Sequence, residues 1–306
     1  MPYKIIFMGT PEFCVPTLEV LAKSQYKISY VYTQPPKKSN RGQKLNPSPI
    51  QKTSKNLNLS VRSPNSLNTE EELDFLKNLN PDIVVVVAYG QLIPVKFLNV
   101  PKKGFINIHA SLLPHWRGAA PIQRAIINLE RETGISIMKI KEELDSGPVM
   151  KKIKININPS DSTNDISEKL SKISSENIVT ALDDIFENKA KFIEQEHNLA
   201  TYAKKIKKIE GKIDWGEDAK KIIGKINGLN PKPGAWFEHK KIRYKIWRAS
   251  ISEKKGVAGS ILDNDFVIGC KDKSIKILEI QREGKNKLLL NDFLLGVNFK
   301  EGEIVN

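Results

Sequence analysis

The chain has little of what metal sites, disulfide frameworks and membrane spans are built from. It contains only two cysteines, Cys14 and Cys270, and four histidines among 306 residues. The cysteines lie far apart, without the neighbouring ligands of a zinc or redox motif, so we expect packing residues in a reducing compartment and no metal site. No apolar run reaches the roughly 18 residues of a membrane helix, and the amino-terminal segment lacks the apolar core of a signal peptide. We therefore expect a cytoplasmic protein that does not bind a membrane.

A glycine-rich dinucleotide fingerprint is also missing. Lys4–Met8 is an expected strand, but Gly9 alone follows it, where that motif needs several glycines. This disfavours a nicotinamide-dependent dehydrogenase. Thr10 is expected to cap the next helix, and a second strand is expected over Ile28–Thr33. The order strand, turn, helix, strand predicts an α/β fold with a Rossmann-like, mostly parallel sheet.

The carboxyl-terminal part of the chain has a different pattern. From Gly211 onward the sequence reads as short strands separated by turns, which is typical of a small β-barrel. We expect a catalytic domain over 1–190, a polar linker over 191–208, and an OB-like β-barrel domain over 209–306.

The net charge of +14 is unevenly distributed. From Thr201 onward 23 Lys and Arg face 14 Asp and Glu, an excess of 9, whereas the first 200 residues hold 26 against 21, an excess of 5. Such an excess suits a polyanionic partner, most readily a nucleic acid. A general compositional bias toward Lys, Asn and Ile would also raise the charge, so charge alone leaves both interpretations open.

A basic loop interrupts the amino-terminal part. Gln34–Pro49 holds four basic residues, no acidic residue and four prolines, and it is long for a connection in an α/β unit. It is either a solvated surface loop or a basic finger, containing Arg41 and Lys44, that closes on a phosphate backbone.

The candidate chemistry lies at the end of a predicted strand over Phe105–His109. A period of two places Asn107 and His109 on one face, at the strand's carboxyl end, where open α/β sheets bind ligands. Asp145 follows a later strand and could approach them. Amide, imidazole and carboxylate groups together suit acyl transfer, although each could equally be a capping, core or turn residue. Ser111 lacks the context of a nucleophile elbow, which favours direct attack by a substrate amine.

Several motifs resemble one family. Asn107-Ile-His109-Ala-Ser111-Leu-Leu-Pro114, Arg117-Gly118-Ala-Ala-Pro121 and Leu144-Asp145-Ser-Gly147 resemble the signature of formyltransferases that use 10-formyltetrahydrofolate. Other segments resemble the branch of that family that acts on methionyl-tRNA: Phe7–Phe13, Arg41–Pro49, Tyr202–Ile206 and Glu210–Trp215.

The resemblance implies a transferase of protein biosynthesis that formylates initiator Met-tRNA for translation initiation. Its implied co-substrate is 10-formyltetrahydrofolate, with no metal, and we expect a monomer. Alternatives are a formyltransferase for a small amine, such as glycinamide ribonucleotide or an amino-sugar nucleotide, and a non-catalytic RNA-binding protein. The implied catalytic residues are Asn107, His109 and Asp145; the implied folate-binding residues are Ser111, Leu112, Leu113, Pro114, Tyr89 and Leu92; the implied tRNA-binding residues are Arg41 and Lys44, with the carboxyl-terminal barrel holding the tRNA.

Overall fold

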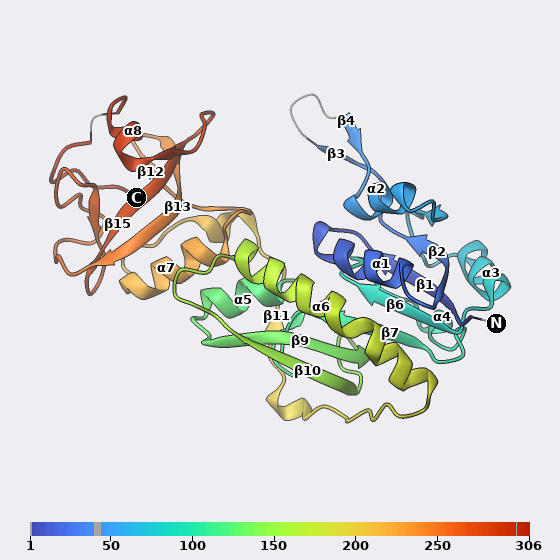
Figure 1. Ribbon diagram of the computed structural model, residues 1–306. Helices are drawn as coiled ribbons and strands as arrows, with labels where there is room; N and C mark the ends of the chain where they lie inside the picture. Colours follow the sequence, from blue (N-terminus) through green and yellow to red (C-terminus); the bar gives the residue numbers. More distant parts are fainter. Residues whose placement is uncertain (1, 40–43, 298) are drawn as a thin grey trace. The chain divides into compact units, whose positions relative to one another are not determined.

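The computed structural model describes residues 2–39, 44–297 and 299–306 (Figure 1). The chain forms two compact units, each assembled from several segments. The first unit comprises residues up to 119 with 134–155 and 167–203, and the second comprises 120–133, 156–166 and 204–306. The domain boundaries expected from the sequence, at 190 and 208, stay a prediction.

A mixed, mostly parallel sheet forms the framework of the first unit. Its order within the described residues is β10-β9-β7-β6-β1-β2-β5. The pairs β5–β2, β2–β1, β1–β6 and β6–β7 are parallel, and β9 runs antiparallel to β7. This confirms the expected fold class. The strands are β1 (Lys4–Gly9), β2 (Lys27–Tyr32), β5 (Val61–Arg62), β6 (Ile83–Val87), β7 (Phe105–His109), β9 (Glu132–Lys139) and β10 (Val149–Asn156).

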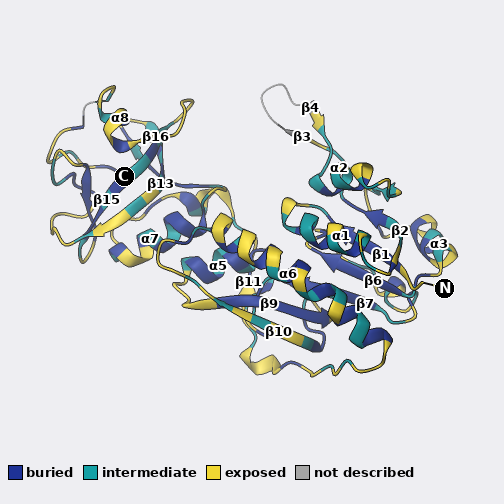
Figure 2. Cartoon of the chain, viewed as in Figure 1, coloured by how far each residue is buried: buried dark blue, intermediate teal, exposed yellow. Residues whose placement is uncertain are grey.

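The centre of this sheet is its apolar core. Every residue of β6 is buried, as expected of a β-branched strand covered on both faces, and Figure 2 shows the central strands as buried. Helices pack on the sheet, the long α6 running alongside its strands (Figure 1). These helices are α1 (Val15–Ala22), α2 (Pro49–Asn56), α3 (Glu70–Leu79), α4 (Val95–Leu98) and α6 (Thr163–Phe186), with a 3₁₀ turn, η1 (Glu12–Cys14), before α1.

Two threonines near the starts of helices make different hydrogen bonds. Thr69 caps α3, because its side chain accepts a hydrogen bond from the Glu72 amide. The prediction for Thr10 was wrong: Pro11 occupies the cap position of η1, and the Thr10 hydroxyl donates to the Tyr89 carbonyl at 2.7 Å. That bond ties the end of β1 to the end of β6.

Two short strand pairs complete the first unit. Strands β3 (Lys37–Ser39) and β4 (Lys44–Asn46) form an antiparallel hairpin in the basic loop. Strand β8 (Arg117–Gly118) pairs in parallel with β11 (Tyr202–Ala203), which follows the 3₁₀ turn η2 (His197–Leu199).

The second unit is built on an antiparallel sheet of order β12-β13-β15-β14, with β16 paired to β15. The expected class is confirmed, although the pairing among the described residues is an open path rather than a closed ring. A core cluster that includes Trp215, Phe237 and Tyr244 fills it. Its elements are α5 (Pro121–Ile127), η3 (Lys208–Gly211), α7 (Ala219–Gly228), β12 (Ala235–His239), β13 (Ile242–Ser252), β14 (Val267–Gly269), β15 (Ser274–Arg282), β16 (Leu288–Leu289) and α8 (Leu290–Leu294).

Helix α7 was not expected, since the sequence beyond Gly211 read as strands and turns. Its apolar residues Ala219, Ile222 and Ile226 recur at helical spacing and are fully buried. Over the described residues, no helix is both long and apolar enough to span a bilayer.

Candidate active site

Strand β7 places the amide and imidazole side by side, as its period of two predicts. Opposite Asn107 and His109 in β9 are Met138 and Ser136. Asn107 is half-buried, while His109 is only 6% exposed. The carboxylate of Asp145 joins them, with Oδ1 at 3.5 Å from Asn107 Nδ2 and Oδ2 at 3.6 Å from His109 Nδ1. The structure thus brings the three candidate catalytic side chains together.

The imidazole is held by a backbone carbonyl. His109 Nε2 lies 2.9 Å from the carbonyl oxygen of Trp116. A carbonyl oxygen only accepts hydrogen bonds, so Nε2 carries the proton of this bond. Nδ1 is therefore the ring nitrogen that faces Asp145, and it donates only when the ring is doubly protonated.

The carboxylate of Asp145 is held by a backbone amide and by the turn that carries it. Its Oδ2 accepts a 2.8 Å hydrogen bond from the amide of Gly118, in β8. Asp145 itself has φ of +48°, a left-handed conformation that costs a non-glycine residue energy. Gly147, two residues on, passes so close to Lys139 that an added Cβ would meet its carbonyl oxygen at 2.0 Å. A tightly constrained turn thus presents the carboxylate.

The residues expected to bind folate differ in exposure. Ser111 and Leu113 are fully buried, and the Ser111 hydroxyl donates to the His115 carbonyl at 2.5 Å. Tyr89 is 2% exposed, whereas Leu92 is 79% exposed. Leu112 is half-buried and Pro114 is buried. In this structure Ser111 and Leu113 thus present no surface to a ligand, and Tyr89 presents almost none.

Of the two residues expected to bind tRNA, Arg41 lies outside the described residues. Lys44 is described only in its backbone, which belongs to β4.

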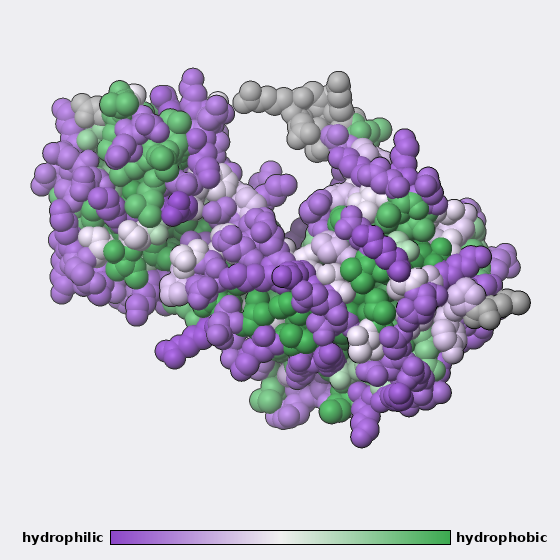
Figure 3. All heavy atoms as spheres, in the orientation of Figure 1, coloured by the Kyte–Doolittle hydropathy of each residue, from purple (hydrophilic) through white to green (hydrophobic). Residues whose placement is uncertain are grey.

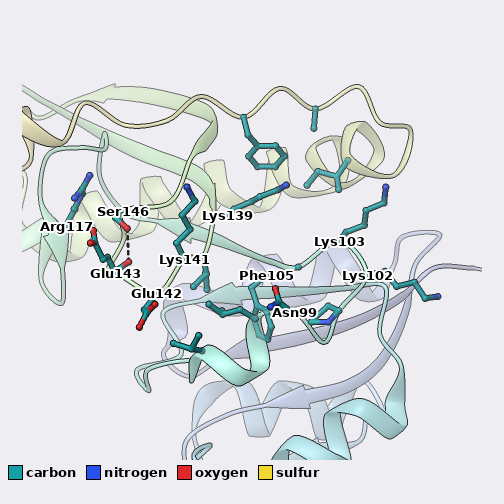
Figure 4. A pocket seen from close by; sticks show the side chains of 18 of the residues that line it. Asn99, Lys102, Lys103, Phe105, Arg117, Lys139, Lys141, Glu142, Glu143 and Ser146 are labelled. Atoms are coloured by element: carbon teal, nitrogen blue, oxygen red, sulfur yellow. Dashed lines mark hydrogen bonds between the residues drawn. The ribbon is translucent and has the colours of Figure 1, made fainter.

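A large cavity of the first unit is lined in part by residues that flank Asp145, although Asn107, His109 and Asp145 are not in its lining (Figure 4). Its volume is about 1450 Å³. It borders the turn through Glu143 and Ser146, whose hydroxyl donates to the Glu143 carbonyl at 3.0 Å. Its walls combine the apolar ring of Phe105 with basic side chains. These are Lys102, Lys103, Lys139, Lys141 and Arg117.

Both cysteines are buried. Burial raises the pKa of the Cys14 thiol and raises that of Cys270 to about 12, so both stay protonated at neutral pH. Within the described ranges no three His, Cys, Asp or Glu side chains are grouped as metal ligands.

Family models match most of the chain. The model described as formyl transferase matches residues 3–182, and the model described as formyl transferase, C-terminal domain, matches residues 205–298. The chain belongs to the formyl transferase family.

Individual relatives agree with this assignment. The formyl transferase is 56% identical to methionyl-tRNA formyltransferase from Pelagibacter ubique over 99% of this chain and 98% of that protein. It is 42% identical to the protein of the same name from Mesorhizobium japonicum, over 99% of both chains. An N-formyltransferase from Helicobacter canadensis, solved with folinic acid and dTDP-3-aminofucose, shares the fold with a TM-score of 0.70 at 19% identity. That match covers 92% of this chain and 100% of the other.

The second unit of this formyl transferase carries a basic groove of about 630 Å³. Its cations are Lys208, Lys232, Arg243 and Lys245, and the guanidinium carbon of Arg243 lies 3.8 Å from the centre of the Trp236 ring. Burial lowers the pKa of Lys245, and the neighbouring charges of Arg243 and Lys208 lower it further. An anion bound beside Lys245 would offset the repulsion from these two neighbouring charges. Figure 3 shows that the visible face of this unit is largely hydrophilic.

Sequence reasoning missed the groups that hold the candidate trio in place. The Trp116 carbonyl and the Gly118 amide are backbone groups, which no side-chain pattern can reveal. Gln195, whose contacts with the Asp145 turn are described below, was also missed, because it lies in a polar segment with no periodicity.

Proposed function

We propose that this formyl transferase transfers the formyl group of 10-formyltetrahydrofolate to the α-amino group of methionine on initiator Met-tRNA. The observation that carries the proposal is the convergence of Asn107, His109 and Asp145 at the end of β7. The proposal is supported by 56% identity to a methionyl-tRNA formyltransferase over almost the whole chain. Such a protein would act in the cytoplasm, as a monomer, and would supply the initiator for translation.

The acceptor amine needs little activation. An α-amino group has a pKa of about 7.7–8.0, and esterification of the adjacent carboxyl lowers it. Much of the acceptor is therefore a free amine at neutral pH. Positioning then becomes the main task of the protein, so the trio needs no nucleophile beside it.

Asn107 and His109 are assigned to the formyl oxygen, where negative charge develops as the amine attacks. Asn107 Nδ2 can donate directly. His109 gives Nε2–H to the Trp116 carbonyl, so it can reach the formyl oxygen only through Nδ1, as an imidazolium that shares this proton between that oxygen and Asp145. Asp145, 3.6 Å from Nδ1, stabilises that charge. Donors fixed in this way contribute about 3 kcal/mol each to transition-state stabilisation.

Asp145 is also placed to deal with the proton that the attacking amine releases. Its Oδ1 lies on the Asn107 side of the site and its Oδ2 is held by Gly118. We assign proton acceptance to this carboxylate, directly or through one water.

Two regions are proposed to take the folate. The large cavity of the first unit exceeds the 300–1000 Å³ of common ligand pockets. It combines aromatic side chains with cations that suit the anionic tail of a folate, although Lys102 and Lys141 already pair with Asp82 and Glu194. The segment Ser111, Leu112, Leu113 and Pro114, with Tyr89 and Leu92, is the second region, which the family resemblance suggests.

The tRNA is proposed to contact the carboxyl-terminal domain over 209–306 and the basic loop with Arg41 and Lys44. The basic groove supports the first contact, since four cations line it against the single carboxylate of Glu283. Phosphate contacts of this kind make binding weaken as salt rises.

The decisive experiment incubates the protein with 10-formyltetrahydrofolate and methionylated initiator tRNA, and detects N-formylmethionine after hydrolysis of the ester. Glycinamide ribonucleotide and an amino-sugar nucleotide serve as competing acceptors. Formylation of the tRNA-bound methionine is the expected result. Turnover of a small amine with none of Met-tRNA would refute the proposal.

A further inference from the structure

Gln195 is a buried polar residue in an exposed stretch of the first unit. It is 7% exposed, whereas the other residues from 191 to 199 are exposed or half-buried. Burying an amide without hydrogen bonds is costly. The position of Gln195 therefore needs an explanation in its contacts.

The Gln195 side chain uses its full hydrogen-bonding capacity. Its Oε1 accepts from Arg117 Nε at 3.1 Å and from Nη2 at 2.8 Å. Its Nε2 donates to the carbonyl of Asp145 at 2.9 Å and to that of Gly147 at 2.7 Å. A guanidinium only donates and a carbonyl only accepts, so these partners also fix which end of the amide is oxygen.

Each partner belongs to the surroundings of the candidate trio. Arg117 is 2% exposed and lies in β8, beside the Gly118 amide that holds the Asp145 carboxylate. Gln195 thus links that strand to the backbone of the Asp145 turn. Gly118 fixes the side-chain end of Asp145, and Gln195 fixes its main-chain end.

The backbone around Gln195 is anchored without its side chain. On one side, Ile193 exchanges two backbone hydrogen bonds with Val149, at 2.8 and 2.9 Å. On the other, Thr201 accepts from the Arg117 amide at 2.9 Å. These bonds hold the backbone of the segment independently of the Gln195 side chain.

We propose that Gln195 is a positioning residue, which keeps the strained Asp145 turn in the geometry that formyl transfer requires. The inference rests on the proposed function. Asp145 has φ of +48°, a conformation that costs a non-glycine residue energy, and the two carbonyl contacts of Gln195 hold the turn in it. Gln195 does not touch the reacting groups and acts only through Asp145.

Two substitutions that keep the length of the side chain separate this positioning role from simple packing. Gln195→Glu keeps the acceptor for Arg117 but sets a carboxylate oxygen against the Asp145 and Gly147 carbonyls. Gln195→Met keeps the shape and loses every hydrogen bond. Asn198→Leu, at an exposed amide in the same segment, is the matched control.

We expect Gln195→Glu and Gln195→Met to lower kcat about 100-fold, as misplacement of a reacting group by about 1 Å does. KM for Met-tRNA should stay within about twofold, since the tRNA contacts are assigned to the basic groove and the basic loop. Added to Asp145→Asn, Gln195→Glu should cost less than about twofold more, because the turn then holds no carboxylate. Asn198→Leu should behave as wild type.

An unchanged kcat in Gln195→Glu would overturn the inference, because it would show that only the Arg117 contact matters. The inference would also be overturned if Gln195→Glu lowered kcat by the same factor in Asp145→Asn as in the wild type. If Gln195→Met fails to fold, Gln195→Glu decides, since it keeps the partner of Arg117. Wild-type protein that forms no formylmethionyl-tRNA would refute the proposed function instead, so the two failures are distinguishable.

Discussion

The Asp145 site and the basic groove are both polar clusters, but they are built in opposite ways. Around Asp145 short or nearly buried groups are each held by a backbone partner, such as Trp116 for His109 and Gly118 for Asp145. In the groove, four long basic side chains are lined up with one carboxylate, that of Glu283, and one of them, Arg243, lies over the Trp236 ring. The first arrangement suits a reaction that needs fixed geometry, and the second suits attraction of a flexible polyanion.

The largest effect should come from the fixed site. Asn107→Ala and Asp145→Ala should each lower kcat for formyl transfer by about 100- to 1000-fold, because each removes a group aimed at the reacting carbonyl or its proton. Retardation of uncharged tRNA on a native gel should be nearly unchanged. Loss of tRNA binding in either variant would show that the two clusters do not have separate roles in catalysis and tRNA binding.

The groove should show the reverse behaviour. The double change Lys208→Ala and Arg243→Ala should raise KM for Met-tRNA by up to about 100-fold, if each cation contributes one charge-assisted hydrogen bond. kcat should be retained, since neither residue belongs to the Asp145 site.

Salt provides the control for the groove. The slope of log affinity against log salt should flatten by about one for each cation–phosphate interaction that the substitutions remove. An unchanged slope would show that the groove does not bind the tRNA backbone.

A smaller effect is expected for the basic loop. Arg41→Ala should lower kcat/KM with Met-tRNA about tenfold, which is the size of one charge-assisted hydrogen bond. The slow hydrolysis of 10-formyltetrahydrofolate by the protein alone should hardly change. Equal reductions in both assays would identify the loop as a structural element rather than a tRNA-binding one.

The sequence predicted what depends on local periodicity. Alternation in Phe105–His109 placed Asn107 and His109 on one face. The same rule, applied with care, would have found α7, since Ala219, Ile222 and Ile226 follow a helical period. The turn residues on either side of that helix are typical of short strands, and they led to the wrong prediction.

What the sequence could not predict depends on contacts between distant segments. Gln195 contacts the Asp145 turn across 50 residues of chain, through an amide that no local pattern distinguishes from its polar neighbours. The Thr10 hydroxyl, expected to cap a helix, instead bonds a carbonyl 79 residues away. Polar side chains have many alternative partners, and only the fold selects among them.

The smallest effect concerns stability rather than activity. Arg124 and Glu210 form a 2.7 Å ion pair within the second unit, and the hydrogen bonds from Arg124 lower the pKa of Glu210. Glu210 therefore binds a proton more readily in the unfolded chain than in the folded one. The ion pair thus adds to the free energy of unfolding at neutral pH, where Glu210 is charged. It is lost as the pH falls below about 4.3 toward the lowered value. Because the Glu210 side chain is 33% exposed, it is worth about 1 kcal/mol or less.

Glu210→Gln should accordingly lower the free energy of unfolding by that small amount at pH 7, with formyl transfer unchanged. The wild-type and variant curves should converge on acidification, as measured by urea unfolding at a series of pH values. Glu130→Gln, at an exposed carboxylate of the same unit, is the control and should follow the wild type throughout. A constant difference between wild type and Glu210→Gln from pH 7 to pH 3 would show that the ion pair is not the cause, and that the substitution acts through packing.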